Sequence, residues 1–277
     1  MMTSTCSNGR VAVVTGANKG IGFYIALQMA VSGLFEHVIL GCRDATRGQS
    51  AVQQLMGLGG IKSNIRYMPL VVGDRASHSK FRDLIEGEFG KLDVLVNNAG
   101  FAFKGRDPTP FEKQTGPTLD INFRGTVDLT SELLPLLKKG QDPRLVNVAS
   151  MSGHLSQLRS SGLQEQFTSS SLTLTKLHAL VDKFESDVQK GIHKQEGWGN
   201  SNYGLSKLAL IAATKVYARE NPDVKVNCCC PGYCITDMTS RRGHQTAEVG
   251  AQTCSLPALM ENPPSGEFFR EMAVASW

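Results

Sequence analysis

Short, continuously apolar runs alternate with longer stretches of helical periodicity along this chain. The first run, residues 11–14, leads into a glycine-rich turn and then into apolar positions spaced as in a helix. Such alternation is typical of βαβ units that stack a parallel sheet, whose strands are buried on both faces. The pattern predicts a doubly wound α/β fold with helices on both faces. Further strands are predicted at residues 38–40, 67–72, 94–96, 145–148 and 224–227, and helices at 81–89 and 127–137.

One segment interrupts this alternation. Residues 156–198 are polar, include three consecutive serines, and have helical periodicity only around residues 177–188. We interpret this segment as an insertion in a single domain of residues 1–277, because no linker or repeat divides the sequence. Residues 239–277 are expected to form a substrate-side region and, after Pro263 and Pro264, a looser tail.

Composition and charge predict a folded protein that does not bind nucleic acid. Hydrophobic residues make up 41% of the 277 residues and charged residues 19%, which is a globular balance. The net charge is only +4 and the basic residues are dispersed, which disfavours a nucleic-acid partner. The first residues are polar and no apolar run has membrane-spanning length. We therefore expect a cytoplasmic protein with no membrane partner.

The seven cysteines predict neither a disulfide framework nor a metal site. Their number is odd, and Cys228, Cys229 and Cys230 are consecutive, a spacing that suits neither paired disulfides nor zinc ligands. Adding Cys234 gives a cluster that has no histidines at ligand spacing. We expect reduced thiols and no metal.

The turn after the first predicted strand is rich in glycine. Glycines at a strand-to-helix turn let backbone N–H groups approach a pyrophosphate at the positive end of the helix dipole. The glycine spacing is wider than the common dinucleotide fingerprint, and glycines also serve ordinary tight turns, so this turn alone leaves both interpretations open. As a cofactor site it would comprise Gly16, Asn18, Lys19, Gly20, Ile21 and Gly22.

The end of the second predicted strand favours NADPH over NADH. Proteins that bind NADH usually have a carboxylate at this position, which accepts hydrogen bonds from the free ribose 2′-hydroxyl. This chain has Arg43 there instead. Arg43 can make charge-assisted hydrogen bonds to a 2′-phosphate, and Lys19 adds a second cation. The alternative is that both are solvated surface cations.

Tyr203 and Lys207 form the candidate proton-transfer pair. They are four residues apart, one turn of a helix, so both can face one cleft. We expect the neighbouring ammonium to lower the pKa of Tyr203, so that its hydroxyl can protonate a carbonyl oxygen. Ser150 could polarise that carbonyl, and Asn122 could hold a water that links Lys207 to solvent. Each of these residues alone is also an ordinary helix, cap or turn residue.

Together these motifs resemble those of the short-chain dehydrogenase/reductase family. The resemblance implies a Rossmann-type sheet and a catalytic tetrad of Asn122, Ser150, Tyr203 and Lys207. It also implies hydride transfer from a nicotinamide to a carbonyl carbon without a metal. The matching segments cover nearly the whole chain and are residues 15–22, 97–100, 147–150, 203–207, 231–232 and 236–238.

The resemblance narrows to the monomeric NADPH-dependent carbonyl reductases. As in that group, a long spacer of 53 positions leads from Ser150 to Tyr203, and the chain ends in Trp277. The resemblance implies a monomer, because in these relatives the insertion covers the helix face that other members use to tetramerise. It also implies that the substrate is a small-molecule ketone, aldehyde or quinone.

The same resemblance implies further cofactor and substrate contacts. Besides the glycine turn, Arg43, Tyr203 and Lys207, the implied cofactor-binding residues are Val71, Val72, Asn98, Ala99, Gly100, Val148, Pro231, Gly232, Cys234, Ile235 and Thr236. The implied substrate residues are Phe103, Gln114, Cys230 and Tyr233.

Some positions depart from the family pattern. Val71 stands where relatives have an Asp that contacts the adenine, and Asp74 lies beyond it. Tyr233 and Ile235 replace a Trp and an Arg, which should change substrate preference. Some relatives accept glutathione adducts near the position of Cys230, but a cysteine at a strand end is more often a small buried hydrophobe.

Two other functions stay open at this point. The fold could serve a non-catalytic NADPH-binding regulator, although intact Ser150, Tyr203 and Lys207 argue against it. It could also serve an alcohol dehydrogenase that works mainly in the oxidative direction, which Lys19 and Arg43 disfavour because cellular NADPH usually serves reduction.

Overall fold

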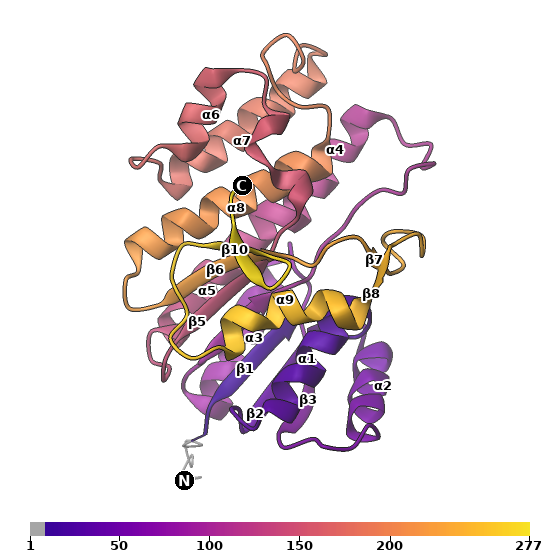
Figure 1. Ribbon diagram of the computed structural model, residues 1–277, viewed down its shortest axis with the longest axis vertical. Coiled ribbons are helices and arrows are strands. Elements are labelled where there is room, and N and C mark those ends of the chain that lie inside the picture. Colours follow the sequence, from indigo (N-terminus) through magenta and orange to yellow (C-terminus); the bar gives the residue numbers. More distant parts are fainter. Residues whose placement is uncertain (1–8) are drawn as a thin grey trace.

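The computed structural model describes residues 9–277 as an α/β protein built on a central sheet (Figure 1). The polar first residues, on which the predicted location depends, lie outside this range. The strands of the sheet are β1 (Val11–Thr15), β2 (His37–Cys42), β3 (Asn64–Pro69), β4 (Val94–Asn97), β5 (Arg144–Val148), β6 (Lys225–Cys230), β9 (Phe268–Arg270) and β10 (Ala273–Ala275).

The strand order confirms the doubly wound prediction. It is β10-β9-β6-β5-β4-β1-β2-β3, and every neighbouring pair is parallel except β9 with β10. The order reverses between β1 and β4, which is the point where ligands bind in open sheets of this kind. A separate pair, β7 (Cys234–Ile235) with β8 (Gln245–Thr246), follows β6.

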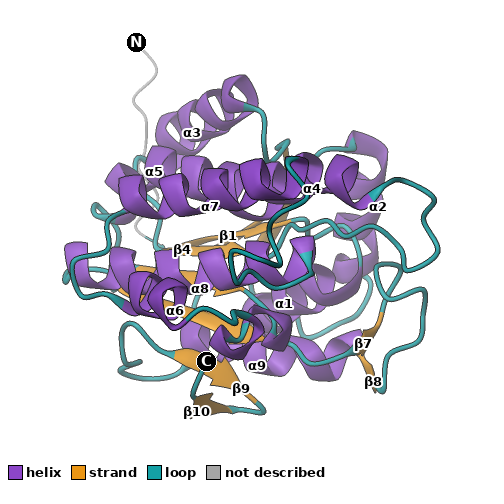
Figure 2. Ribbon diagram, turned by 90° about the horizontal axis from the view of Figure 1, so that it is seen from above, coloured by secondary structure: helices purple, strands orange, loops and turns teal. Residues whose placement is uncertain are grey.

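Helices cover both faces of the sheet (Figure 2). Apolar side chains of α1 (Gly20–Ser32), α2 (Ala45–Met56) and α9 (Ala247–Leu259) bury one face. Those of α3 (Arg75–Phe89), α5 (Thr126–Leu137) and α8 (Asn202–Glu220) bury the other. Within residues 9–277, no helix is both long and apolar enough to cross a membrane.

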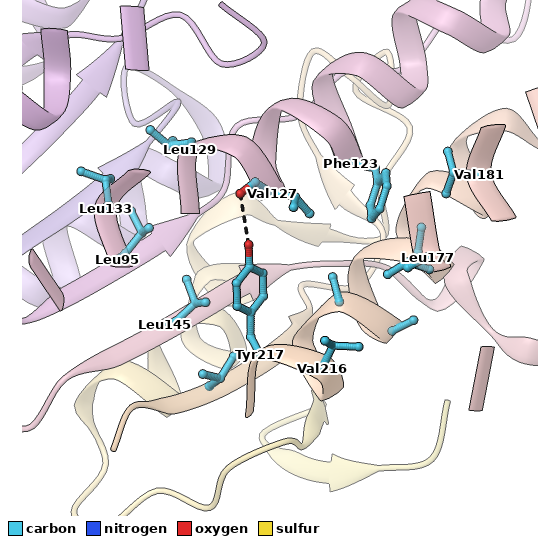
Figure 3. Packing of buried hydrophobic residues seen from close by; sticks show 14 of the residues in the cluster. Leu95, Phe123, Val127, Leu129, Leu133, Leu145, Leu177, Val181, Val216 and Tyr217 are labelled. Atoms are coloured by element: carbon cyan, nitrogen blue, oxygen red, sulfur yellow. Dashed lines mark hydrogen bonds between the residues drawn. The ribbon is translucent and has the colours of Figure 1, made fainter. Parts of the chain in front are cut away.

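The second of these cores joins α8 to α5 by polar as well as apolar contacts (Figure 3). The hydroxyl of Tyr217 on α8 donates to the carbonyl of Val127, 3.1 Å away, and lies 3.0 Å from the hydroxyl of Ser131. Around this bond lie Leu129, Leu133 and other fully buried side chains. The burial fixes α8 along its length, and α8 also carries the candidate proton-transfer pair.

Two sequence predictions about the ends of the sheet were wrong. The strand predicted at 67–72 ends at Pro69, because the N–H of Val71 donates to the hydroxyl of Ser77 and the chain turns toward α3. The tail expected to be loose instead forms β9 and β10. Phe268 and Phe269 are buried as β9 pairs with β6, but a strand of three residues is too short to show in the sequence pattern.

The inserted segment before α8 folds into two helices, α6 (Ser161–Thr168) and α7 (Leu174–Gln189). Short 3-10 turns at Met151–Gly153 and Leu155–Gln157 lead into it. Trp198 closes the segment: only 1% of this residue is exposed, and its indole N–H donates to the carboxylate of Asp187 on α7 over 2.8 Å. Lys183 donates to the same oxygen over 2.6 Å. The indole therefore satisfies a buried carboxylate as well as filling space.

This contact predicts the cost of replacing the indole. Trp198→Phe keeps an aromatic ring but removes the donor to buried Asp187, so we expect a loss of about 1–3 kcal/mol in the free energy of unfolding. Urea unfolding followed by circular dichroism measures it. Trp277→Phe, at a half-buried indole, is the control and should cost less. Equal losses in the two variants would contradict the role given to the Trp198–Asp187 bond.

Candidate active site

The glycine turn lies between β1 and α1, at the switch point of the sheet. Gly16 and Gly20 have φ values of +64° and +60°, in the left-handed region that favours glycine. A Cβ on Gly22 would lie 2.3 Å from the side-chain nitrogen of Asn98, and one on Gly16 would lie 2.9 Å from the Cα of Ala99. No side chain caps α1 at Lys19. The glycines therefore let the turn pack against the segment after β4, and the uncapped N-terminus of α1 forms a cradle suited to a phosphate.

The segment after β4 is bonded to this turn. The hydroxyl of Thr15 accepts from the backbone N–H groups of Asn98 (3.0 Å) and Ala99 (2.9 Å). The side chain of Asn98 donates back to the carbonyl of Thr15 over 2.9 Å. Asn98 and Ala99, predicted as cofactor residues, therefore lie beside the glycine turn. Gly100, predicted with them, lies nearer the proton-transfer pair, since a Cβ on it would be 3.6 Å from the ammonium of Lys207.

The two cations predicted to select NADPH differ in their surroundings. Arg43 directly follows β2 and is exposed. Lys19 is also exposed, but its ammonium lies 2.6 Å from the carboxylate of Asp237, in the loop after β7. The hydrogen bond from Lys19, together with its charge, lowers the pKa of Asp237. Arg43 is therefore better able than Lys19 to bind a phosphate, because its charge is not paired with a carboxylate of residues 9–277.

Val71 and Val72, predicted at the adenine end, lie in the loop between β3 and α3. Val71 is 40% exposed. Asp74 does not replace the missing Asp of the family pattern, because its carboxylate caps α3 by accepting from the N–H groups of Ala76 and Ser77. This loop offers the adenine an apolar side chain rather than a free carboxylate.

The proton-transfer pair lies on the first turns of α8. Ser201 caps this helix by accepting from the N–H of Gly204, which places Tyr203 and Lys207 on one side. The ammonium of Lys207 lies 5.7 Å from the centre of the Tyr203 ring and donates to the carbonyl of Val148 over 2.8 Å. The hydroxyl of Ser150, just after β5, accepts from the N–H of Ser152 over 3.1 Å and lies near enough to the Tyr203 hydroxyl to lower its pKa.

Burial has the largest effect on both titrating groups. It raises the pKa of Tyr203 to about 12, although the hydrogen bond from Ser150 acts in the opposite direction. It also lowers the pKa of Lys207 to about 8. The shift of Tyr203 is opposite to the one predicted from the sequence, because burial disfavours the charged phenolate more than neighbouring groups favour it.

Asn122 lies in a short π-helix, Asp120–Gly125, between α4 (Phe111–Leu119) and α5. Helix irregularities of this kind often occur at functional sites. Asn122 is fully buried and holds Phe101 in place: its side chain accepts from the N–H of Phe101 over 2.7 Å and donates to its carbonyl over 2.8 Å. It also donates to the hydroxyl of Ser206 over 3.0 Å. A water between Asn122 and Lys207 stays a prediction.

The segment after β6 faces the glycine turn. Thr236 lies close enough that its methyl group would be 3.7 Å from a Cβ placed on Gly20. Ile235 is 45% exposed and Cys234 is buried. The segment begins with Pro231 and Gly232, and Gly232 has a φ of +76°. The residues predicted after this strand therefore lie across the crevice from the predicted phosphate cradle.

The four predicted substrate residues are not equally placed. The Cys230 thiol is buried next to Ser150, where it accepts from the N–H groups of Met151 (3.2 Å) and Gly232 (3.4 Å). Tyr233 is 49% exposed, and Phe103 packs edge-on against Phe101. Gln114 lies on α4 and donates to the carbonyl of Thr109 over 2.6 Å, so its amide stabilises its own loop.

The predicted site residues omit two members of this site, although both lie in the matching segments 15–22 and 236–238. Thr15 bonds the turn to β4, and its position at the carboxyl end of an apolar run was a signal that could have identified it. Asp237 pairs with Lys19 from 218 positions away, and no sequence signal predicts that pairing. Within residues 9–277, no group of three or more His, Cys, Asp or Glu side chains could hold a metal ion.

Comparison with known proteins agrees with this geometry. The family model described as short chain dehydrogenase matches residues 10–162. Carbonyl reductase (NADPH) 1 of Homo sapiens is 41% identical, over 96% of this chain and 98% of that protein. Carbonyl reductase (NADPH) 3 of Mus musculus is also 41% identical, over 99% of this chain and 100% of that protein.

A solved structure also matches closely. Salutaridine reductase from Papaver somniferum superimposes with a TM-score of 0.86 and 33% identity, covering 94% of this chain and 99% of that one. The glycine turn, the Tyr203–Lys207 pair and these matches lead to one conclusion: the chain belongs to the short-chain dehydrogenase family.

Proposed function

We propose that this protein is an NADPH-dependent carbonyl reductase that converts ketones, aldehydes or quinones to alcohols, with Tyr203 as the proton donor. One observation carries the proposal: Ser150, Tyr203 and Lys207 converge at the sheet edge that also holds the glycine cradle. The full-length similarity to proteins named carbonyl reductase (NADPH) supports the same reaction.

The residues at the switch point fit a dinucleotide phosphate. Gly16 and Gly22 let the turn pack closely against Asn98 and Ala99, and the uncapped start of α1 presents N–H groups. Arg43 would pair with the 2′-phosphate, which is why we propose NADPH rather than NADH. When bound, NADPH supplies the hydride that adds to the carbonyl carbon.

The proton comes from the protein. With a pKa of about 12, Tyr203 keeps its proton at neutral pH and is therefore a donor rather than a base. As the carbonyl oxygen gains negative charge, the Tyr203 hydroxyl transfers its proton to it, and the Ser150 hydroxyl stabilises the same oxygen. The ammonium of Lys207 then offsets the charge left on the phenolate, which regains a proton from solvent. The carbonyl carbon thus gains a hydride and its oxygen a proton.

The catalytic residues separate this proposal from a non-catalytic NADPH-binding regulator. A regulator needs the cradle but not a half-buried Tyr203 beside Ser150, nor an ammonium held 2.8 Å from the carbonyl of Val148. We also propose that the protein is a monomer, because α7 packs along α4 and α8 and covers their outer surface. Its location in the cytoplasm stays a prediction from the sequence.

Removing the proton donor should abolish reduction and spare cofactor binding. Tyr203→Phe keeps the ring and is expected to lower kcat at least about 100-fold, with NADPH affinity nearly unchanged. NADPH oxidation with a panel of aldehydes and ketones, together with fluorescence titration of NADPH, measures both. Tyr217→Phe on the same helix is the control, because it removes another buried hydroxyl away from the site. A Tyr203→Phe enzyme with normal turnover would refute the mechanism.

The lowered pKa of Lys207 predicts a pH dependence. As pH rises through about 8, Lys207 loses its proton and no longer stabilises the phenolate, so kcat/KM for reduction should fall. In Lys207→Met the activity should be low throughout and this decline should be absent. A profile of kcat/KM against pH for the two enzymes is the measurement. The same decline in both would mean that another group causes it.

The two cations near the cradle should contribute unequally to cofactor choice. Arg43→Gln is expected to weaken NADPH binding about tenfold, the scale of a charge-assisted bond, and to leave NADH binding unchanged. Lys19→Gln should have a smaller effect, because Asp237 already neutralises that ammonium. Calorimetric titration with each cofactor measures the difference. Equal losses for NADPH and NADH in Arg43→Gln would argue against a phosphate contact.

A further inference from the structure

Arg270 places a guanidinium on the substrate side of the active site. It is the last residue of β9, which pairs in parallel with β6 so that Arg270 lies opposite Cys230. Both residues stand at the carboxyl end of the sheet, where the segment after β5 carries Ser150. The strand pairing therefore places Arg270 beside Cys230, the residue that precedes Pro231 and Gly232.

Side-chain contacts tie Arg270 to the catalytic segment. One guanidinium nitrogen lies 3.8 Å from the sulfur of Met151, which directly follows Ser150. The N–H of Met151 in turn donates to the thiol of Cys230. Burial raises the pKa of Cys230, and the charge of Arg270 is among the weaker influences that lower it. The charge of Arg270 therefore acts on Met151 and Cys230, the residues beside Ser150.

Among the described residues, one nitrogen of the guanidinium has no carboxylate partner. Glu271 lies 2.9 and 2.7 Å from the other two, but the two side chains are 43% and 77% exposed, and exposed ion pairs of this kind contribute little. A negatively charged group beside Ser150 can therefore compete with Glu271 for this guanidinium.

We propose that Arg270 makes this enzyme favour carbonyl substrates that carry a carboxylate. The inference rests on the proposed function, since the substrate carbonyl must lie at Ser150 and Tyr203. The carboxylate at the other end of the molecule accepts from the planar guanidinium, which matches two oxygens at once. The ordinary alternative, a solvated cation at a strand end, predicts no discrimination between charged and neutral substrates.

Two matched aldehydes test the proposal. The first, 4-carboxybenzaldehyde, carries a carboxylate, and the second, its methyl ester, is neutral and similar in shape and ring electronics. Arg270→Gln is expected to lower kcat/KM for the carboxylate about fivefold, mainly through KM, and to leave the ester nearly unchanged. Added salt should reduce the wild-type preference for the carboxylate and have little effect in the variant.

Glu271→Gln provides a second variant that does not remove the guanidinium. It releases Arg270 from its partner and should raise kcat/KM for the carboxylate, so it keeps the test decisive if Arg270→Gln folds poorly. Equal changes for acid and ester in both variants would overturn the inference and leave the proposed function standing. Failure of the wild-type enzyme to reduce either aldehyde, or any other carbonyl, would overturn both.

Discussion

The parallel direction of the strands is the constraint on which the site depends. Because β1, β4, β5, β6 and β9 all run the same way, the segments that follow them emerge at one edge of the sheet. The glycine turn, Asn98, Ser150 and Cys230 come from distant parts of the sequence and meet there. A single reversed strand would carry its polar segment to the opposite edge.

Burial acts on the two titrating groups of this edge in opposite directions. It disfavours the phenolate of Tyr203 and the ammonium of Lys207 alike, which raises the first pKa and lowers the second. The hydroxyl thus keeps its proton at neutral pH, as the proposed donor role requires. The carbonyl of Val148 accepts from the ammonium of Lys207 and holds it near Tyr203. The fold itself, rather than a neighbouring charge, sets the starting state of the pair.

The sequence predicted those parts of the fold and site that local signals specify. Apolar runs identified the central strands, and the glycine turn and the Tyr203–Lys207 spacing identified the two halves of the site. Features that depend on distant segments were not predictable. Arg270 lies on a strand of three residues, and Asp237 meets Lys19 only after the whole sheet has formed. The direction of the Tyr203 shift depends on how deeply α8 is packed, which spacing along a helix does not encode.

The strand order also has a consequence for synthesis. The strands β4, β1, β2 and β3 are neighbours in the sheet and all lie between Val11 and Asn97. This half can therefore pair its strands while the remaining chain is still being made, since chains emerge at about 5–20 residues per second. The half that carries Ser150, Tyr203 and Arg270 can then add to the edge formed by β4. The proposed nucleotide cradle is thus synthesised before the proposed catalytic residues.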